Sequence, residues 1–310
     1  MMAVHHRIHG LTRSALTALG LRVEATKASA RLPDLLVAAE KAATAVRMGE
    51  HAQRRAGSGE KFWQFREYIA GDRPQDIDWR QSGRGDRVFV RQKEWQTTQT
   101  ALLWCQRNDS MHYASRSILP TKFESAATIS MALGMLMMGA GELVGTLDGS
   151  LRPGKGEIAI QSLGEKLLEP DFGSLPRNLM REPARHATIV LAGDFLSPLD
   201  DIEHAIHALA GRTVNILLLQ ILDPAEINLP FRGRVIFEAP HTGAKHHITN
   251  VDSVRDSYKQ KITAHIEGLR ALCHHNGWHY VQHTTDIDTA VTLLALWQKI
   301  GQSRKGGPLS

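Results

Sequence analysis

The chain has 310 residues, 42% hydrophobic and 22% charged, which is typical of a soluble globular protein with a large core. The formal net charge of +5 is modest, and basic residues alternate with acidic ones instead of forming a stripe, which disfavours a nucleic-acid-binding role. The longest weakly polar run, residues 126–140, is too short to span a bilayer, so we expect no membrane span. The two cysteines, Cys105 and Cys273, lie in apolar contexts without metal-type spacing, which predicts reduced core residues of a cytoplasmic protein.

The N-terminal third of the chain divides into three segments. Residues 1–30 are basic and poor in bulky side chains, which predicts a flexible arm. Apolar residues then recur at helical spacing from Pro33 to about Arg54, which predicts a helix. In residues 57–94 acids and bases alternate among aromatic residues. A disordered charged segment would lack those rings, so we interpret this stretch as a folded ion-pair scaffold that belongs with the helix in one segment, residues 31–94.

Strands and helices alternate through the rest of the chain. Strands are predicted at residues 87–94, 97–105, 143–147, 157–160, 188–192, 214–222 and 278–283, with a hairpin over 233–238 and 246–248. Helices are predicted at residues 123–139, 162–168, 198–209, 251–276 and 287–300. Several strands are fully apolar, which indicates a sheet covered on both faces. We therefore predict an α/β fold with an open, doubly wound, mostly parallel sheet over residues 95–300 and a disordered tail over 301–310.

The charged stretch also carries a long, irregular motif, G-x-x-F-x-x-F-R-E-Y-x-x-G-D-x-x-x-D-I-D-W-R-x-S-x-R. It resembles the signature of domain of unknown function 58, a bacterial family. The matching residues are Gly59, Phe62, Arg66, Glu67, Tyr68, Gly71, Asp72, Asp76, Ile77, Asp78, Trp79, Arg80, Ser82 and Arg84. The resemblance implies a von Willebrand factor A-like α/β domain, with the signature as an elaboration that precedes it. It also implies a MoxR-type AAA+ ATPase as a partner.

Domains of the von Willebrand A type carry Asp-x-Ser-x-Ser after the first parallel strand, and its oxygens hold Mg²⁺ together with a later Asp. The aligned residues here are Gln106, Asn108 and Ser110, and the later Asp is Asp194. A neutral amide replaces the first carboxylate, and Asp109 falls one residue out of register. We therefore expect a degenerate site without metal or cofactor, held by amide hydrogen bonds, unless Asp109 swings inward.

Other readings of the residues involve catalysis. Asp72, Asp76 and Asp78 are the basis of an alternative hypothesis, a metal-dependent hydrolase. Against it, the neighbouring arginines would neutralise the carboxylates, and in an extended chain Ile77 and Trp79 would face inward. Histidines and Cys273 near residues 273–283 do not have the converging spacing of a zinc site. The chain has no G-x-S-x-G elbow and no phosphate-binding loop.

These observations favour a non-catalytic adaptor over an enzyme. The resemblance implies work beside the ATPase in assembly or maturation of other proteins. Ligands of open α/β sheets bind beyond the carboxyl ends of the strands, where the strand order reverses. We therefore expect the partner to contact that edge, with Arg107 and Asp109 supplying charge and Phe195 an apolar anchor.

Overall fold

The protein is described here by a computed structural model, which divides the chain into two compact units. One unit is residues 47–98, and the larger one combines residues 1–46 with 99–310. The structure describes residues 32–48, 64–69, 72–83, 85, 87–92, 99–169, 175, 187–209, 214–238 and 245–305. The predicted arm over residues 1–30 lies outside these ranges.

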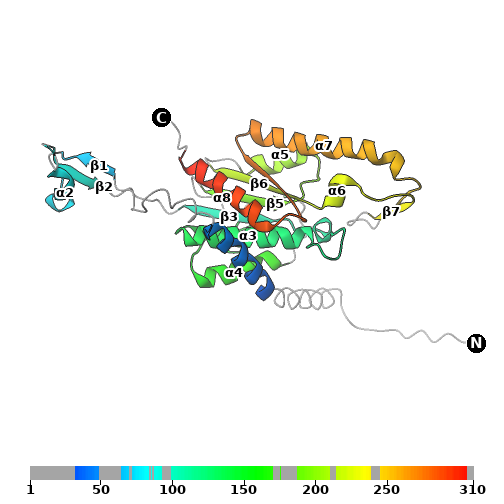
Figure 1. Cartoon of the computed structure of the whole chain (residues 1–310), viewed down its shortest axis with the longest axis horizontal. Helices are drawn as coiled ribbons and strands as arrows, with labels where there is room; N and C mark the ends of the chain where they lie inside the picture. The colour runs from blue at the N-terminus through cyan, green and yellow to red at the C-terminus, as the bar shows by residue number, and fades with distance from the viewer. Residues whose placement is uncertain are drawn as a thin grey trace, which may run out of the picture. The chain divides into compact units, whose positions relative to one another are not determined.

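The larger unit is built on a five-stranded sheet (Figure 1). Its strands are β3 (Thr100–Cys105), β4 (Leu143–Thr146), β5 (Thr188–Gly193), β6 (Asn215–Leu222) and β9 (His279–Thr284). All neighbours pair in parallel, in the order β4-β3-β5-β6-β9. The chain leaves β3 toward β4 and then returns to the other side of β3 with β5. The strand order therefore reverses between β3 and β5, which places the crevice of this sheet at their carboxyl ends.

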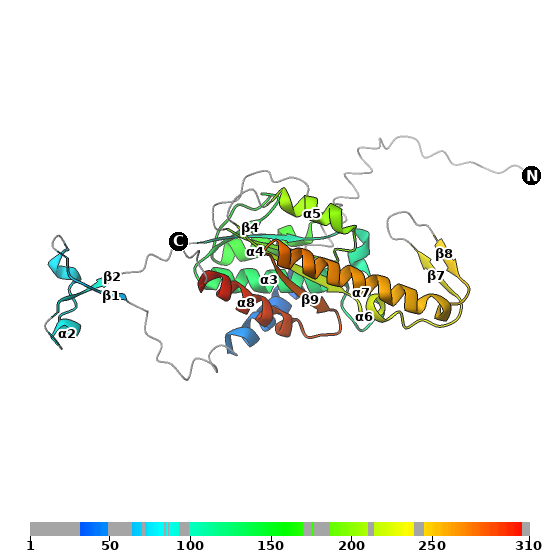
Figure 2. The same cartoon turned by 90° about the horizontal axis from the view of Figure 1, so that it is seen from above.

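Helices cover both faces of the sheet, as the fully apolar strands predicted (Figures 1 and 2). On one face α3 (Lys122–Gly139), α4 (Glu157–Leu168), α8 (Thr289–Lys305) and the helical residues 32–48 share a core with Leu103 and Cys105. On the other face α5 (Leu199–His207) and α7 (Asp252–His275) pack on Leu102 and Trp104. Alternate residues of β3 thus serve opposite cores, which is the period-2 geometry of a strand.

Residues 32–46 of the helix at 32–48 group with the α/β unit and not with the charged stretch, so a unit boundary falls inside the predicted segment 31–94. The reason is burial: Leu35, Ala39, Ala43 and Val46 lie in the same core cluster as α3. On α4, Gly164 makes room for the Leu32 side chain, because a Cβ there would come within 2.6 Å of Leu32 Cδ1.

Three local predictions need correction. Residues 157–160 are not a strand but the first turn of α4, which begins after Gly156 at a φ of 89° and buries Leu163 and Leu167. The predicted tail is helical as far as Lys305, because α8 continues past residue 300. A short helix after β6, α6 (Pro224–Asn228), was not predicted.

The remaining local structure agrees with the sequence patterns. The hairpin is present as β7 (Val235–Glu238) paired antiparallel with β8 (Lys245–Ile248). In the part of the chain that the structure describes, no helix is long and apolar enough to cross a membrane.

The smaller unit, described by itself, is a two-stranded antiparallel ladder with short helical turns. β1 (Gln64–Glu67) pairs with β2 (Phe89–Gln92), which lies within the strand predicted at residues 87–94. Between them the chain forms η1 (Pro74–Asp76) and α2 (Trp79–Ser82). Asp78 N–H donates to the Phe89 carbonyl (2.9 Å), which ties these turns to β2.

Candidate functional site

The loop after β3 and the end of β5 meet at the crevice of the sheet, as the motif comparison predicted. Gln106 is 2% exposed, and its Nε2 donates to Asn108 Oδ1 and to Asp194 Oδ1, both at 3.0 Å. Its Oε1 accepts the backbone N–H of Asp194 (3.0 Å). A side chain at Gly193 would clash with Gln106, so this close approach requires glycine. The amide side chains therefore hold the loop as expected.

Ser110 completes the predicted set. Its Oγ lies 2.6 Å from Asp194 Oδ2 and 2.9 Å from Asn108 Oδ1, and the charged carboxylate is the stronger acceptor for its single proton. Asp194 also accepts weakly from the backbone N–H of Leu196 (3.4 Å). All four residues of the degenerate site, Gln106, Asn108, Ser110 and Asp194, thus converge in space.

The centre of the site is a residue that the sequence analysis did not select, Lys122. It lies in the first turn of α3 and is 0% exposed. Its Nζ lies 3.1 Å from Asp194 Oδ2 and 2.6 Å from Glu226 Oε1. A signal was available, because a lysine at the positive end of a helix dipole is unfavourable unless a carboxylate lies nearby.

Glu226 reaches the site through the local structure of α6. Asp223 and Glu226 form a capping box at the start of α6. The Asp223 side chain accepts backbone N–H groups of the first turn, and the Glu226 side chain accepts the Asp223 backbone N–H. Asp223 is 0% exposed and also accepts the N–H groups of Ser115 (2.9 Å) and Ala225 (2.8 Å). These bonds hold the loop after β6 against the loop after β3.

The protonation of the site follows from burial and from Lys122. Burial alone would raise the pKa of Asp194, but the Lys122 ammonium and the hydrogen bonds that Asp194 accepts hold it below its usual value. Burial raises the pKa of Glu226, and Lys122 only partly offsets that rise. Burial and the nearby carboxylates of Asp223 and Glu226 raise the pKa of Tyr113 to about 12. Asp194 is therefore ionised at neutral pH and depends on the ammonium.

A divalent cation does not fit this arrangement as it stands, because the Lys122 ammonium already lies within hydrogen-bond distance of both carboxylates. Asp109 does not turn inward: it is exposed, at the start of η2 (Asp109–His112). Among the described residues, no three His, Cys, Asp or Glu side chains are grouped to hold a metal. The arrangement is an internal electrostatic clamp that joins α3, β5 and α6.

Two of the three predicted partner contacts, Phe195 and Arg107, interact within the chain. Phe195 is 1% exposed and packs against Trp104 with ring centroids 6.4 Å apart, so an exposed anchor at Phe195 is wrong. Phe195 has a left-handed backbone, with a φ of 48°, and the residue after it, Leu196, is 39% exposed. The Arg107 guanidinium donates to the carbonyls of Lys166 (2.7 Å) and Glu169, so it caps the end of α4.

The signature residues lie in the smaller unit, and only some of their side chains are described. Glu67 pairs with Arg87 at the surface. Asp78 is 7% exposed and accepts the Arg80 N–H (3.0 Å). Trp79 is 69% exposed, so the prediction that it faces inward is wrong. The period-2 argument fails because Trp79 begins a helical turn and is not in an extended chain.

The other signature positions leave both hypotheses about this stretch open. Tyr68 is 40% exposed, and Asp72 Oδ2 accepts the Ile69 N–H (2.9 Å). Gly71 and the side chains of Arg66 and Asp76 lie outside the described residues. The buried ion-pair network and the hydrolase built on Asp72, Asp76 and Asp78 therefore stay predictions.

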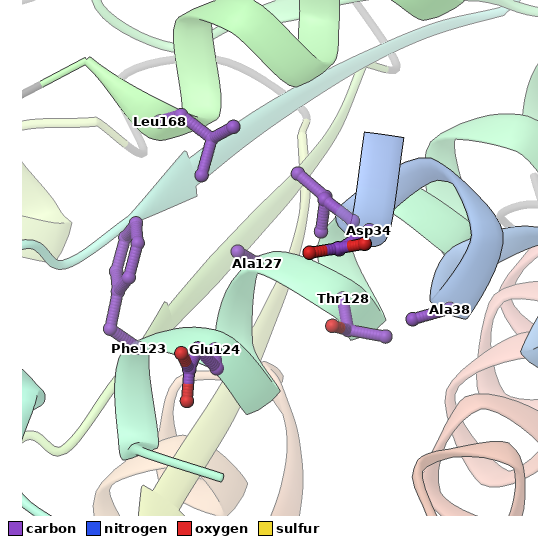
Figure 3. Close-up of a pocket in the computed structure, with 8 residues that line it drawn as sticks. Asp34, Ala38, Phe123, Glu124, Ala127, Thr128 and Leu168 are labelled. Atoms are coloured by element: carbon purple, nitrogen blue, oxygen red, sulfur yellow. The ribbon is translucent and has the colours of Figure 1, made fainter. Parts of the chain in front are cut away.

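A separate pocket of about 220 Å³ lies between residues 34–38, the first turns of α3 and the end of α4 (Figure 3). Its lining is largely apolar with two carboxylates: Asp34, Leu35, Ala38, Phe123, Glu124, Ala127, Thr128 and Leu168. Glu124 serves the helix itself, since its Oε2 accepts the Thr121 N–H (2.8 Å) in a capping box. The pocket coincides with none of the predicted site residues.

Comparisons with known proteins give a family and no activity. The profile of the family described as "Protein of unknown function DUF58" matches residues 64–268. An uncharacterized protein of Mycobacterium tuberculosis is 22% identical over 258 residues, which cover 78% of this chain and 80% of the relative. An uncharacterized protein of Mycobacterium avium is 26% identical over 132 residues, 43% of this chain and 75% of the relative.

Solved structures resemble the chain only distantly. A crystal structure of an aerotolerance-related membrane protein from Bacteroides fragilis matches with a TM-score of 0.38 and 13% identity, covering 66% of this chain and 99% of that chain. The conserved hypothetical protein BatB from Bacteroides thetaiotaomicron matches with a TM-score of 0.36 and 13% identity, covering 67% and 100%.

Proposed function

The chain belongs to the DUF58 family of proteins of unknown function, and we propose that it is a non-catalytic protein-interaction protein. In this proposal it acts in the cytoplasm as an adaptor for a MoxR-type AAA+ ATPase, in the assembly or maturation of other proteins. The observation that carries the proposal is the clamp at the sheet crevice: Lys122 is fully buried against Asp194 and Glu226. A sequestered ammonium shapes a surface but cannot touch a substrate.

We also propose that the larger unit is a von Willebrand factor A-like domain. Its parallel strand order supports this, as does the convergence of Gln106, Asn108, Ser110 and Asp194 at the switch between β3 and β5. Binding at this edge would then depend on protein surface and not on a bound ion.

Apolar side chains are exposed on several loops at this edge. Ile118 is 83% exposed in the connection from β3 to α3, Leu196 is 39% exposed after β5, and Ile287 is 46% exposed after β9. Parallel strands bring their carboxyl ends to one edge, so these three loops share a side of the sheet. They replace Phe195 as candidate apolar contacts with the partner.

The test is direct binding of the purified chain to the MoxR-type ATPase of the same organism, by biolayer interferometry in EDTA. We expect the wild type to bind, and Ile118→Asp and Leu196→Asp to weaken binding at least about tenfold, which is about 1.4 kcal/mol. Val37→Asp is the matched control, since Val37 is 71% exposed on the helix at residues 32–48. Circular dichroism and melting establish that each variant folds.

Two results would refute the proposal in different ways. If the wild type shows no binding, the ATPase is not the partner. The second result is that Ile118→Asp and Leu196→Asp both bind like the wild type, while Trp79→Ala or deletion of residues 1–30 abolishes binding. In that case the ATPase contacts another surface.

A further inference from the structure

The carboxylates of Asp194 and Glu226 at the sheet crevice require a cation, and the Lys122 side chain supplies it. Two carboxylate oxygens contact the Lys122 ammonium, Asp194 Oδ2 at 3.1 Å and Glu226 Oε1 at 2.6 Å. A third oxygen, Ser110 Oγ, lies 2.6 Å from Asp194 Oδ2. The side chain of Asp194 is 4% exposed and that of Glu226 18%. Water therefore screens their charges little, and a positive charge at this point is required.

The charges do not balance with lysine in place. Two carboxylates carry a formal charge of −2, and one ammonium leaves −1. A divalent ion would leave zero. Hard oxygen atoms from carboxylates and hydroxyls are the ligands that Mg²⁺ and Mn²⁺ take, and Mg²⁺ is commonly held by one or two carboxylates with water completing its shell.

We propose that the Lys122 ammonium is a built-in substitute for a divalent cation, and that shortening this side chain converts the crevice into a Mg²⁺ or Mn²⁺ site held by Asp194, Glu226 and Ser110. This inference goes beyond the adaptor role and does not depend on any partner. Lysine delivers its charge with the fold itself, so the crevice is assembled at any metal concentration. A divalent ion would need to displace a covalently attached competitor whose local concentration is fixed.

The experiment compares the wild type with Lys122→Ala and Lys122→Met. Alanine removes both the charge and the length of the side chain, which leaves room for a hydrated ion. Methionine removes the charge but keeps most of the volume, so it is the matched control. Mn²⁺ binding is measured by electron paramagnetic resonance and by calorimetry, and the Tm is measured with and without Mn²⁺ or Mg²⁺.

We expect about one Mn²⁺ per chain in Lys122→Ala, and none in the wild type or Lys122→Met. Mn²⁺ should raise the Tm of Lys122→Ala by several degrees, because a ligand that binds only the folded state stabilises it. Adding Asp194→Asn to Lys122→Ala should abolish both effects.

Three outcomes would overturn the proposal. One is a folded Lys122→Ala that binds no Mn²⁺ at millimolar concentration. Another is a wild type that binds Mn²⁺ as tightly as Lys122→Ala. The last is a Lys122→Ala protein that is unfolded both with and without Mn²⁺, because the ion would then fail to replace the ammonium.

Discussion

Replacing Lys122 by methionine tests the clamp most directly. Methionine fills much of the lysine volume, so the packing of α3 changes little and the lost interaction is mainly electrostatic. Asp194, at 3% exposure, then keeps its charge in a buried environment without the ammonium that lay 3.1 Å away. Glu226 loses its contact at the same time.

The magnitude follows from burial. Breaking a buried ion pair by removing one partner costs about 3–5 kcal/mol. In a unit of this size, 1 kcal/mol shifts the Tm by about 2–4 °C, so the Tm should fall by roughly 6–20 °C at pH 7.5. Lys166→Met is the control, because Lys166 pairs with Glu169 at the surface, with side chains 31% and 52% exposed. Such a pair contributes about 0–1 kcal/mol.

The pH dependence gives a second, independent signature. In the wild type the folded-state pKa of Asp194 is held below its unfolded value, so its stabilising contribution is present at neutral pH and is lost in acid. In Lys122→Met burial acts without the ammonium, and the folded-state pKa should rise above the unfolded value. The carboxylate then destabilises the variant at neutral pH, and protonation relieves this as the pH falls.

The assay is thermal unfolding of the wild type and both variants between pH 7.5 and 4.5. The Tm gap between wild type and Lys122→Met should be widest at pH 7.5 and narrower at pH 4.5. A gap below about 2 °C at pH 7.5, or one that does not change with pH, would show that the lysine is not the counter-ion of Asp194.

Three further predictions concern stability elsewhere in the chain. Gly145→Ala should lower the Tm more than Gly134→Ala, because a Cβ at Gly145 would lie 2.7 Å from the Leu151 carbonyl oxygen, whereas at Gly134 its nearest neighbour is a side-chain methyl group; equal losses would contradict this. Burial lowers the pKa of His283 from 6.5 to about 4, so as the pH falls His283 is protonated in the unfolded chain before it is protonated in the folded chain. Stability should therefore fall between pH 6.5 and 4, by up to about 3 kcal/mol, and His283→Asn should show a flatter profile in denaturant titrations. Asp78→Ala should destabilise the unit of residues 47–98 by about 1–3 kcal/mol, seen as faster hydrogen exchange confined to that unit; unchanged exchange there would argue against a structural role.

The sequence was sufficient for the layers of the fold, because burial on both faces of a parallel sheet leaves a strong local signal. Runs such as residues 188–192 and 214–222 are apolar without alternation, and they became β5 and β6. The pairing of Gln106 with Asp194 was also predictable, since the carboxyl ends of neighbouring parallel strands meet. Errors arose where local patterns were ambiguous: residues 157–160 fit a strand or a helical turn, and the glycine before them decided for the helix.

Only the tertiary structure identified what lies at the centre of the site. Asp194 lies 72 residues after Lys122 in the sequence, and Glu226 lies 104 residues after it. No local sequence pattern links the three residues. In the sequence the position of Lys122 at a helix start signals only that some carboxylate should lie nearby, and nothing local says which one. Folding buries the lysine completely, and a buried charge requires a partner at hydrogen-bond distance, so the tertiary structure makes Lys122 the cation of the crevice. Phe195 shows the reverse: a loop position predicted to contact a partner is buried in the core, where its ring packs against Trp104.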